Sequence, residues 1–255
     1  MDIAEHIAVL ALEGERIASA GEEAGPDALV PTCPEWAVRD LLHHQGGLFR
    51  WSAGYVAGAV VERKGLDYDT TVGALPDDAH LIEWFGQCHA DLVETLRSAD
   101  PAVQCWTFMA APSPLAFWAR RQAHESSIHR VDAELAAELT PEVVTPSFGA
   151  DGLDELLAGF FARRQGDPRA DPPRSLSVRC TDVDAGWRMT VSTESVTTTA
   201  EADAGATAPD CIVRGPASDL YHSLWNRLPA DVLTIEGDSA ALDLFMDQYK
   251  VRWSI

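Results

Sequence analysis

The chain has 255 residues, of which 46% are hydrophobic and 23% are charged, so it can bury a sizeable core in one or two domains. Acidic residues outnumber basic residues by 40 to 19, which gives a formal net charge of −21. A surface this acidic repels phosphate backbones and anionic lipids, so we expect neither nucleic acid nor a membrane as a partner.

The cysteine pattern and the first residues indicate the compartment. The five cysteines are odd in number and include no CxxC pair, which is typical of a reducing environment rather than of a disulfide framework. The opening residues carry acids and lack the basic segment of a signal peptide, and no run of about 18 apolar residues occurs. We therefore expect a cytoplasmic protein.

Apolar residues recur at helical spacing through the first half of the chain. The pattern predicts four amphipathic helices, at about residues 2–24, 34–61, 77–100 and 112–138. Thr32 or Cys33 is expected to cap the second helix, with Pro34 in its first turn. Four helices of this length form a four-helix bundle, although the long connections leave its order open.

The second half of the chain changes character after Pro141 and Pro146. Short segments with alternating or β-branched residues indicate strands, and they are interspersed with helical segments. We predict helices at about 148–167, 215–227 and 239–250, and strands at about 175–180, 186–192, 195–200, 210–215 and 231–238. The sequence thus predicts a helical domain over residues 1–142 and a small α+β domain with an antiparallel sheet over residues 148–255.

The fourth predicted helix carries an unusual polar face. Gln122, Glu125, His129 and Asp132 follow one another at steps of three or four residues, so their side chains lie on one side of the helix. A carboxylate and an imidazole four residues apart have the spacing of two ligands to one metal ion. The same spacing also occurs in ion pairs on solvated helix faces, so the pattern alone leaves both interpretations open.

Two adjacent histidines on the second predicted helix add a third candidate ligand. Side chains next to each other on a helix point about 100° apart. His43 lies on a polar face, whereas His44 lies on the inward face with Leu41 and Leu48. His44 is either a buried histidine with satisfied ring nitrogens or a partner of the pair on the fourth helix. Two imidazoles and one carboxylate would leave a coordination position open, as in catalytic zinc sites.

Three sequence blocks resemble those of a known family. "VPTCPEWAVRDLLHHQGGLFRW" and "WARRQAHESSIHRVDAE" are similar to the two signature blocks of the mycothiol-dependent maleylpyruvate isomerase family, and "IVRGPASDLYHSLWNRLP" followed by "LTIEGD" resembles its C-terminal block. The resemblance implies a DinB-like metal-binding bundle followed by a domain like sterol carrier protein. It places one divalent metal, usually zinc, on His44, Glu125 and His129, and Asp132 is suited to accept the second ring N–H of His129.

The resemblance also implies an activity. In the family, the metal binds the thiol of a low-molecular-weight cofactor, mycothiol, and the resulting thiolate attacks a small electrophile such as maleylpyruvate. The reaction would be a cis-trans isomerisation or an S-transfer, by a monomer or a weak homodimer. Arg227 is expected to hold the cofactor or a substrate carboxylate as a catalytic and cofactor-binding residue, unless it is a solvated arginine at a helix end. Arg121 is a second candidate for cofactor binding, with a surface ion pair as the alternative.

Two other functions stay open at this level. The protein could be a non-catalytic small-molecule or lipid-binding protein with a vestigial or structural metal site, because its second domain resembles a lipid carrier. It could also be a metallohydrolase, which needs a spare general base near the metal, and Asp132 is the obvious candidate. Cys33 is interpreted as a capping or buried residue rather than a ligand.

Overall fold

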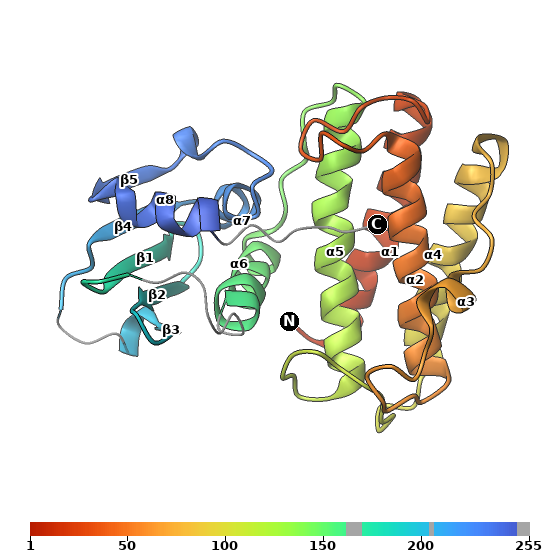
Figure 1. Ribbon diagram of the computed structural model, residues 1–255, viewed down its shortest axis with the longest axis horizontal. Helices are drawn as coiled ribbons and strands as arrows, with labels where there is room; N and C mark the ends of the chain where they lie inside the picture. Colours follow the sequence, from red (N-terminus) through yellow and green to blue (C-terminus); the bar gives the residue numbers. More distant parts are fainter. Residues whose placement is uncertain (162–169, 204–206, 249–255) are drawn as a thin grey trace. The chain divides into compact units, whose positions relative to one another are not determined.

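The structure is a computed structural model and describes residues 1–161, 170–203 and 207–248 (Figure 1). The chain forms two compact units, the first over Met1–Glu142 and the second beginning at Val143. Within the described ranges, every helix is too short or too polar to span a membrane. The five cysteines all lie in these ranges, and no disulfide joins any of them.

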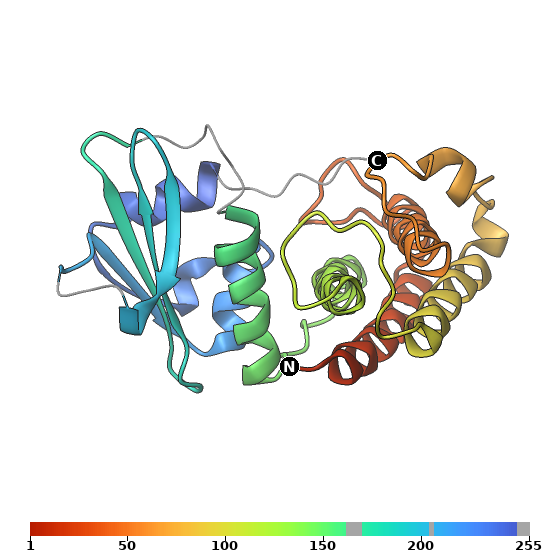
Figure 2. The ribbon, with the colours of Figure 1, turned by 90° about the horizontal axis from the view of Figure 1, so that it is seen from below.

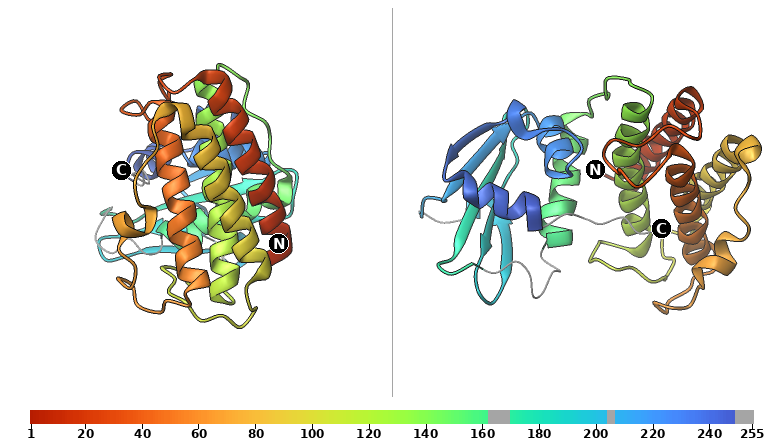
Figure 3. Two further views of the ribbon diagram at one scale, coloured as in Figure 1. Left: turned by 90° about the vertical axis from the view of Figure 1, so that its right-hand side faces the viewer. Right: turned by 45° about the horizontal axis from the view of Figure 1, so that its top comes forward.

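The first unit is the predicted four-helix bundle. Its long helices are α1 (Ile3–Ala24), α2 (Val38–Ala57), α4 (Leu81–Ser98) and α5 (Pro114–Ala136), and a short helix α3 (Tyr68–Val72) and a 3₁₀ turn (Asp78–His80) lie between α2 and α4. Helices α1 and α2 each pack against both α4 and α5, so α1 and α2 lie diagonally across the bundle (Figure 3, left). This arrangement places α2 beside α5, the two helices that carry the candidate ligands.

Helix α2 begins later than the sequence pattern predicts. Residues 30–36 form a turn closed by backbone hydrogen bonds, in which the N–H of Val30 donates to the carbonyl of Trp36 at 2.9 Å. Pro34 therefore lies in the turn and not in the helix. The predicted cap is also wrong, because the N-cap residue is Ala37, whose N–H donates to the Asp40 carboxylate at 2.9 Å.

The second unit combines a five-stranded sheet with helices. The strands are β1 (Arg174–Cys180), β2 (Gly186–Val191), β3 (Val196–Ala200), β4 (Cys211–Gly215) and β5 (Thr234–Gly237), in the spatial order β3-β2-β1-β4-β5. Helices α6 (Pro146–Asp154), α7 (Ala217–Leu224) and α8 (Ser239–Gln248) lie on one side of it, and a π-helical segment, Glu155–Phe160, continues α6 (Figure 2). Apolar side chains of the central strands, such as Val178 and Met189, are fully buried.

The sheet is mixed, which corrects the prediction of a purely antiparallel one. Strands β1 and β4 pair in parallel, with Val178 opposite Val213, whereas the other three pairings are antiparallel. Two further predictions reach beyond the described residues, because the helix expected at 148–167 enters residues 162–169 and the last helix extends past residue 248.

Candidate functional site

The structure brings the three candidate ligands together inside the bundle. The Nε2 atoms of His44 and His129 lie 3.6 Å and 3.4 Å from Oε1 of Glu125. Four ligands around a zinc ion at about 2.1 Å are separated from one another by about 3.4 Å, so these distances fit donors that share one ion. The donor atoms of all three side chains lie within 4.8 Å of one another, and all three side chains are buried.

The two carboxylate oxygens of Glu125 face different groups: one faces an arginine and the other faces the two imidazoles. Nη2 of Arg121 donates to Oε2 at 2.8 Å, and both side chains are buried. Among the described residues, no hydrogen-bond donor reaches Oε1, which faces the imidazoles. Burial favours the neutral acid, but the Arg121 guanidinium and the two imidazoles outweigh burial and hold the pKa of Glu125 well below its ordinary value. An ionised oxygen is therefore available to a cation.

The orientation of His129 is set by a carboxylate one turn away. Nδ1 of His129 lies 2.8 Å from Oδ2 of Asp132, and both side chains are fully buried. A carboxylate only accepts hydrogen bonds, so Nδ1 carries the proton and Nε2 is directed at the cluster. The other oxygen of Asp132 accepts a hydrogen bond from the Thr32 hydroxyl. Burial opposes a charge on His129, yet Asp132 and Glu125 together raise its pKa.

His44 occupies the inward position that its helical phase predicts. Its side chain is 7% exposed, and burial lowers its pKa, a shift that Glu125 only partly offsets. The indole of Trp36 packs against the rings of His44 and His129, with centroids 4.9 Å and 6.1 Å away. The neutral imidazole of His44 keeps a nitrogen lone pair for a ligand. The indole of Trp36 that covers the ring keeps water away from it.

The remaining polar residues of α5 join it to neighbouring helices. Gln122 donates to the Ser52 hydroxyl at 2.8 Å. Arg130 is fully buried and binds Glu13 of α1 and Glu134 of its own helix, each at 2.5 Å. These contacts join α5 to α2 and α1, so its buried polar side chains hold the helix in place as well as present Glu125 and His129.

The other residues proposed from the sequence lie in settings that differ from those expected. His43 is half-buried and contacts the carbonyl of Pro76 at 3.2 Å, so it is not the exposed residue that a polar face suggests. Arg121 does form the expected ion pair, but in the bundle interior and not at the surface. Arg227 follows the end of α7 at Leu224, is buried, and donates from Nη1 to the Trp225 carbonyl at 2.9 Å. The interpretation of Arg227 as a solvated helix-end residue is therefore wrong.

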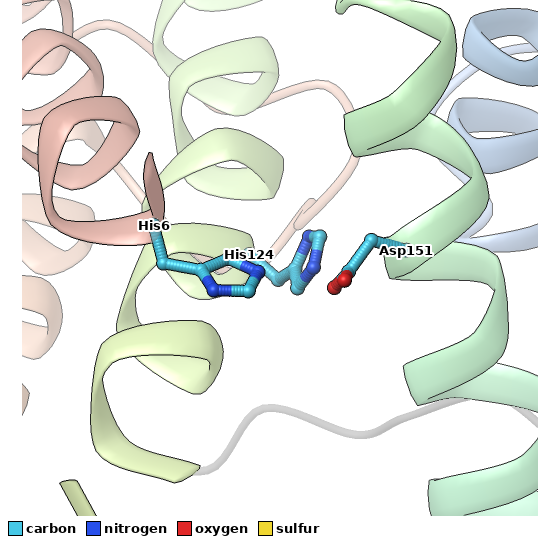
Figure 4. Close-up of side chains that lie close together, drawn as sticks. All are labelled: His6, His124 and Asp151. Carbon is cyan, nitrogen blue, oxygen red and sulfur yellow. The ribbon is translucent and has the colours of Figure 1, made fainter. Parts of the chain in front are cut away.

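A second pair of imidazoles lies elsewhere in the bundle. His6 of α1 and His124 of α5 approach edge to face, with ring centroids 6.0 Å apart (Figure 4). His124 immediately precedes Glu125, so on the helix its side chain points away from the first cluster. Neither residue stands out in the sequence, because the two positions are far apart in the chain and only the packing of α1 on α5 brings them together.

Sequence reasoning also missed the roles of Thr32 and Trp36. Both lie in the turn before α2, where a threonine suggests a helix cap and a tryptophan suggests core. Their position within the block that contains His44 was the available signal. Only the fold shows that Thr32 reaches Asp132 on α5.

Known proteins share this two-part organisation. A family model described as the mycothiol maleylpyruvate isomerase N-terminal domain matches residues 10–134, and the C-terminal domain model of that family matches residues 147–244. Crystal structures of a mycothiol-dependent maleylpyruvate isomerase and of its histidine-to-alanine mutant are similar in fold, with TM-scores of 0.62 and 0.63 at 12% and 11% identity. Each alignment covers 92% of this chain and 93% of the other. No curated protein matches the sequence.

Proposed function

The chain belongs to the mycothiol maleylpyruvate isomerase family, and we propose that it is a metal- and thiol-dependent enzyme acting on a small electrophile. The reaction is a cis-trans isomerisation or an S-transfer with mycothiol as the thiol. The observation that carries the proposal is the buried cluster of His44, Glu125 and His129, in which the described residues provide no hydrogen-bond donor for Oε1 of Glu125.

The donor set suits a divalent metal, most simply zinc. Two imidazole nitrogens and one carboxylate oxygen are ligands that zinc prefers, and three protein ligands leave one position for a small molecule. Arg121 keeps Glu125 ionised, and Asp132 directs Nε2 of His129 at the cluster. Glu125 and His129 are therefore ready to bind before a metal arrives. A metal in this site would lower the pKa of a bound thiol and so supply a thiolate at neutral pH.

The protein side chains around the cluster would limit the access of water to a thiol bound there. Trp36 covers the imidazoles and limits access of water. A thiol held at the open position would supply a nucleophile able to add reversibly to an electrophilic double bond, which is what a cis-trans isomerisation requires. No atom is gained or lost in this isomerisation. The same thiol chemistry would also support an S-transfer, in which the thioether product is released.

Among the residues that the structure describes, the hydrolase alternative has no spare general base at the cluster. Asp132 is the obvious residue for that role, but its two oxygens accept hydrogen bonds from Thr32 and His129. A hydrolytic water would need another acceptor close to the cluster. Glu125 is the nearest, and it is paired with Arg121 and assigned as a ligand. These contacts favour thiol chemistry over activation of water.

We assign Arg227 as the anchor for a carboxylate of the thiol cofactor or the substrate. The chemistry fits, because a guanidinium binds carboxylates in a bidentate manner. Its burial and its bond to the Trp225 carbonyl hold the side chain in one conformation. Replacement of Arg227 by Ala is expected to weaken mycothiol binding while the metal stays bound, which titration calorimetry and elemental analysis measure separately. Loss of metal in this variant would exclude the assignment.

Elemental analysis of the purified protein, followed by turnover assays, tests the proposed function. We expect about one equivalent of zinc or another divalent metal, and turnover of maleylpyruvate or an activated electrophile only when mycothiol is present. Turnover that is equally fast without any thiol would contradict both the isomerase and the transferase and would revive the hydrolase. Absence of metal would favour the binding-protein alternative.

A further inference from the structure

The turn before α2 contacts the ligand cluster through two side chains. Thr32 reaches the carboxylate that orients His129, and Trp36 packs on the rings of His44 and His129. His44 itself follows on the same continuous segment, in the second turn of α2. One short stretch of chain therefore controls both imidazoles, although one of them belongs to α5.

Backbone hydrogen bonds hold this turn in one conformation. The N–H of Val30 donates to the Trp36 carbonyl at 2.9 Å, and the N–H of Trp36 donates to the Cys33 carbonyl at 2.8 Å. Leu29 and Ala37 form an isolated antiparallel bridge at its base. Val30 is fully buried, and Trp36 is 6% exposed. The hydroxyl of Thr32 is thus presented by a fixed scaffold and not by a free loop.

The hydrogen bonds at Asp132 have only one consistent direction. An ionised carboxylate accepts and cannot donate, so the Thr32 hydroxyl and His129 Nδ1–H are both donors to it. With both of its oxygens engaged, the plane of the carboxylate cannot rotate freely. His129 then has one ring orientation and one tautomer, with Nε2 directed at Oε1 of Glu125, 3.4 Å away.

We propose that Thr32 is a positioning residue for the metal site, acting through Asp132 on His129. The inference deepens the proposed function and rests on it, because the role of the bond from Thr32 is to keep a metal ligand in its binding geometry. Thr32 is not one of the three candidate ligands. If Thr32 had only a structural role, it would stabilise the turn without affecting His129. The experiment must distinguish that role from positioning of His129.

The experiment compares three variants of the full chain with zinc as the only added ligand. Thr32→Val removes the hydroxyl at nearly constant shape, and Thr32→Ser restores it. Thr71→Val is the matched control, because the Thr71 hydroxyl donates to the Asp67 carbonyl on the separate short helix α3. Zinc affinity is measured by competition with a chromophoric chelator. Long-range ¹H–¹⁵N spectra of the metal-free protein report the tautomer of His129 at a pH where the ring is neutral.

We expect Thr32→Val to bind zinc about 10-fold more weakly, at the lower end of the range for partners of metal ligands. Thr32→Ser and Thr71→Val should keep the wild-type affinity, and the Nδ1–H tautomer of His129 should become mixed only in Thr32→Val. Unchanged affinity and an unchanged tautomer in Thr32→Val would overturn the inference while leaving the proposed function intact. A wild-type protein that does not bind zinc, or a His44→Ala variant that binds it normally, would overturn both.

Discussion

Arg121 and Glu125 form an ion pair inside the bundle, with Nη2 of the arginine 2.8 Å from Oε2 of the carboxylate and both side chains at most 5% exposed. The pair leaves Oε1 directed at the two imidazoles. Arg121 therefore acts on the cluster without belonging to it, because it keeps the carboxylate charged in a buried place.

Replacement of Arg121 by Gln is expected to destabilise the metal-free protein by about 3 kcal/mol, since it leaves a buried charge without its partner. Urea unfolding in the presence of a chelator measures this. Arg97→Gln is the control, because Arg97 is exposed on α4, and it should change the free energy of unfolding by about 0.5 kcal/mol or less. Equal changes in the free energy of unfolding for the two substitutions would show that the buried pair contributes no more to stability than an exposed arginine.

The neighbouring histidines provide an internal comparison for metal binding. His44→Ala should abolish stoichiometric zinc, because two donors remain from a set of three. His43→Ala should retain zinc and cost about 1 kcal/mol, more than a surface substitution, because the ring packs against Trp84 and contacts the Pro76 carbonyl. Elemental analysis and thermal unfolding check the two expectations. Zinc loss in His43→Ala instead would mean that the other face of α2 meets the metal.

Two glycines in the bundle are expected to respond to alanine in opposite directions. A Cβ at Gly14 of α1 would lie 2.3 Å from the ring of His89, whereas a Cβ at Gly86 of α4 meets nothing within 4 Å among the described residues. Gly14→Ala should lower the free energy of unfolding by about 1–3 kcal/mol through overpacking. Gly86→Ala should raise it by up to about 1 kcal/mol through helix propensity. Urea unfolding of both variants tests the tightness of the contact between α1 and α4, and a neutral Gly14→Ala would contradict it.

His89 is expected to make the bundle sensitive to acid. Burial lowers the pKa of His89, whose Nε2–H donates to the Leu10 carbonyl at 3.0 Å. Below about pH 6.5 the unfolded chain takes up a proton that the folded ring resists, so stability is present above that pH and falls as the pH drops. Unfolding free energies at pH 7.5 and 5.5 should therefore differ less in His89→Gln than in the wild type.

His80 provides the matched control for this pH effect. The exposed ring of His80 has its pKa raised by Asp77, so the contribution of His80 to stability has the opposite sign and is lost as the pH rises. His80→Gln should therefore leave the acid-induced loss of stability in place. An identical pH dependence in His89→Gln and the wild type would exclude His89 as its source.

The helical phase of α2 and α5 could be predicted because regular helices repeat over many residues. The spacing of Glu125, His129 and Asp132 and the inward direction of His44 follow from that repeat, and the structure places them accordingly. The α and α+β organisation could be predicted for a similar reason, because each element has its own local pattern, and the structure confirms it.

The features that sequence reasoning missed depend on contacts between distant residues. The start of α2 is fixed by the backbone hydrogen bond from Val30 to Trp36. This hydrogen bond overrides the local preference of Pro34 for a first helical turn. The parallel pairing of β1 with β4 joins residues 176–180 to residues 211–215, and no local pattern reports it. Thr32 likewise meets Asp132 from a hundred residues away.

We propose that the cluster of His44, Glu125 and His129 holds a metal that an external thiol then binds. X-ray absorption at the zinc edge, recorded with and without mycothiol, tests it most directly. We predict nitrogen and oxygen neighbours at about 2.0–2.2 Å in the protein alone, and an additional sulfur at about 2.3 Å when mycothiol is added. A spectrum that does not change on addition of the thiol, or a sulfur neighbour already present without it, would exclude binding of the thiol to this metal.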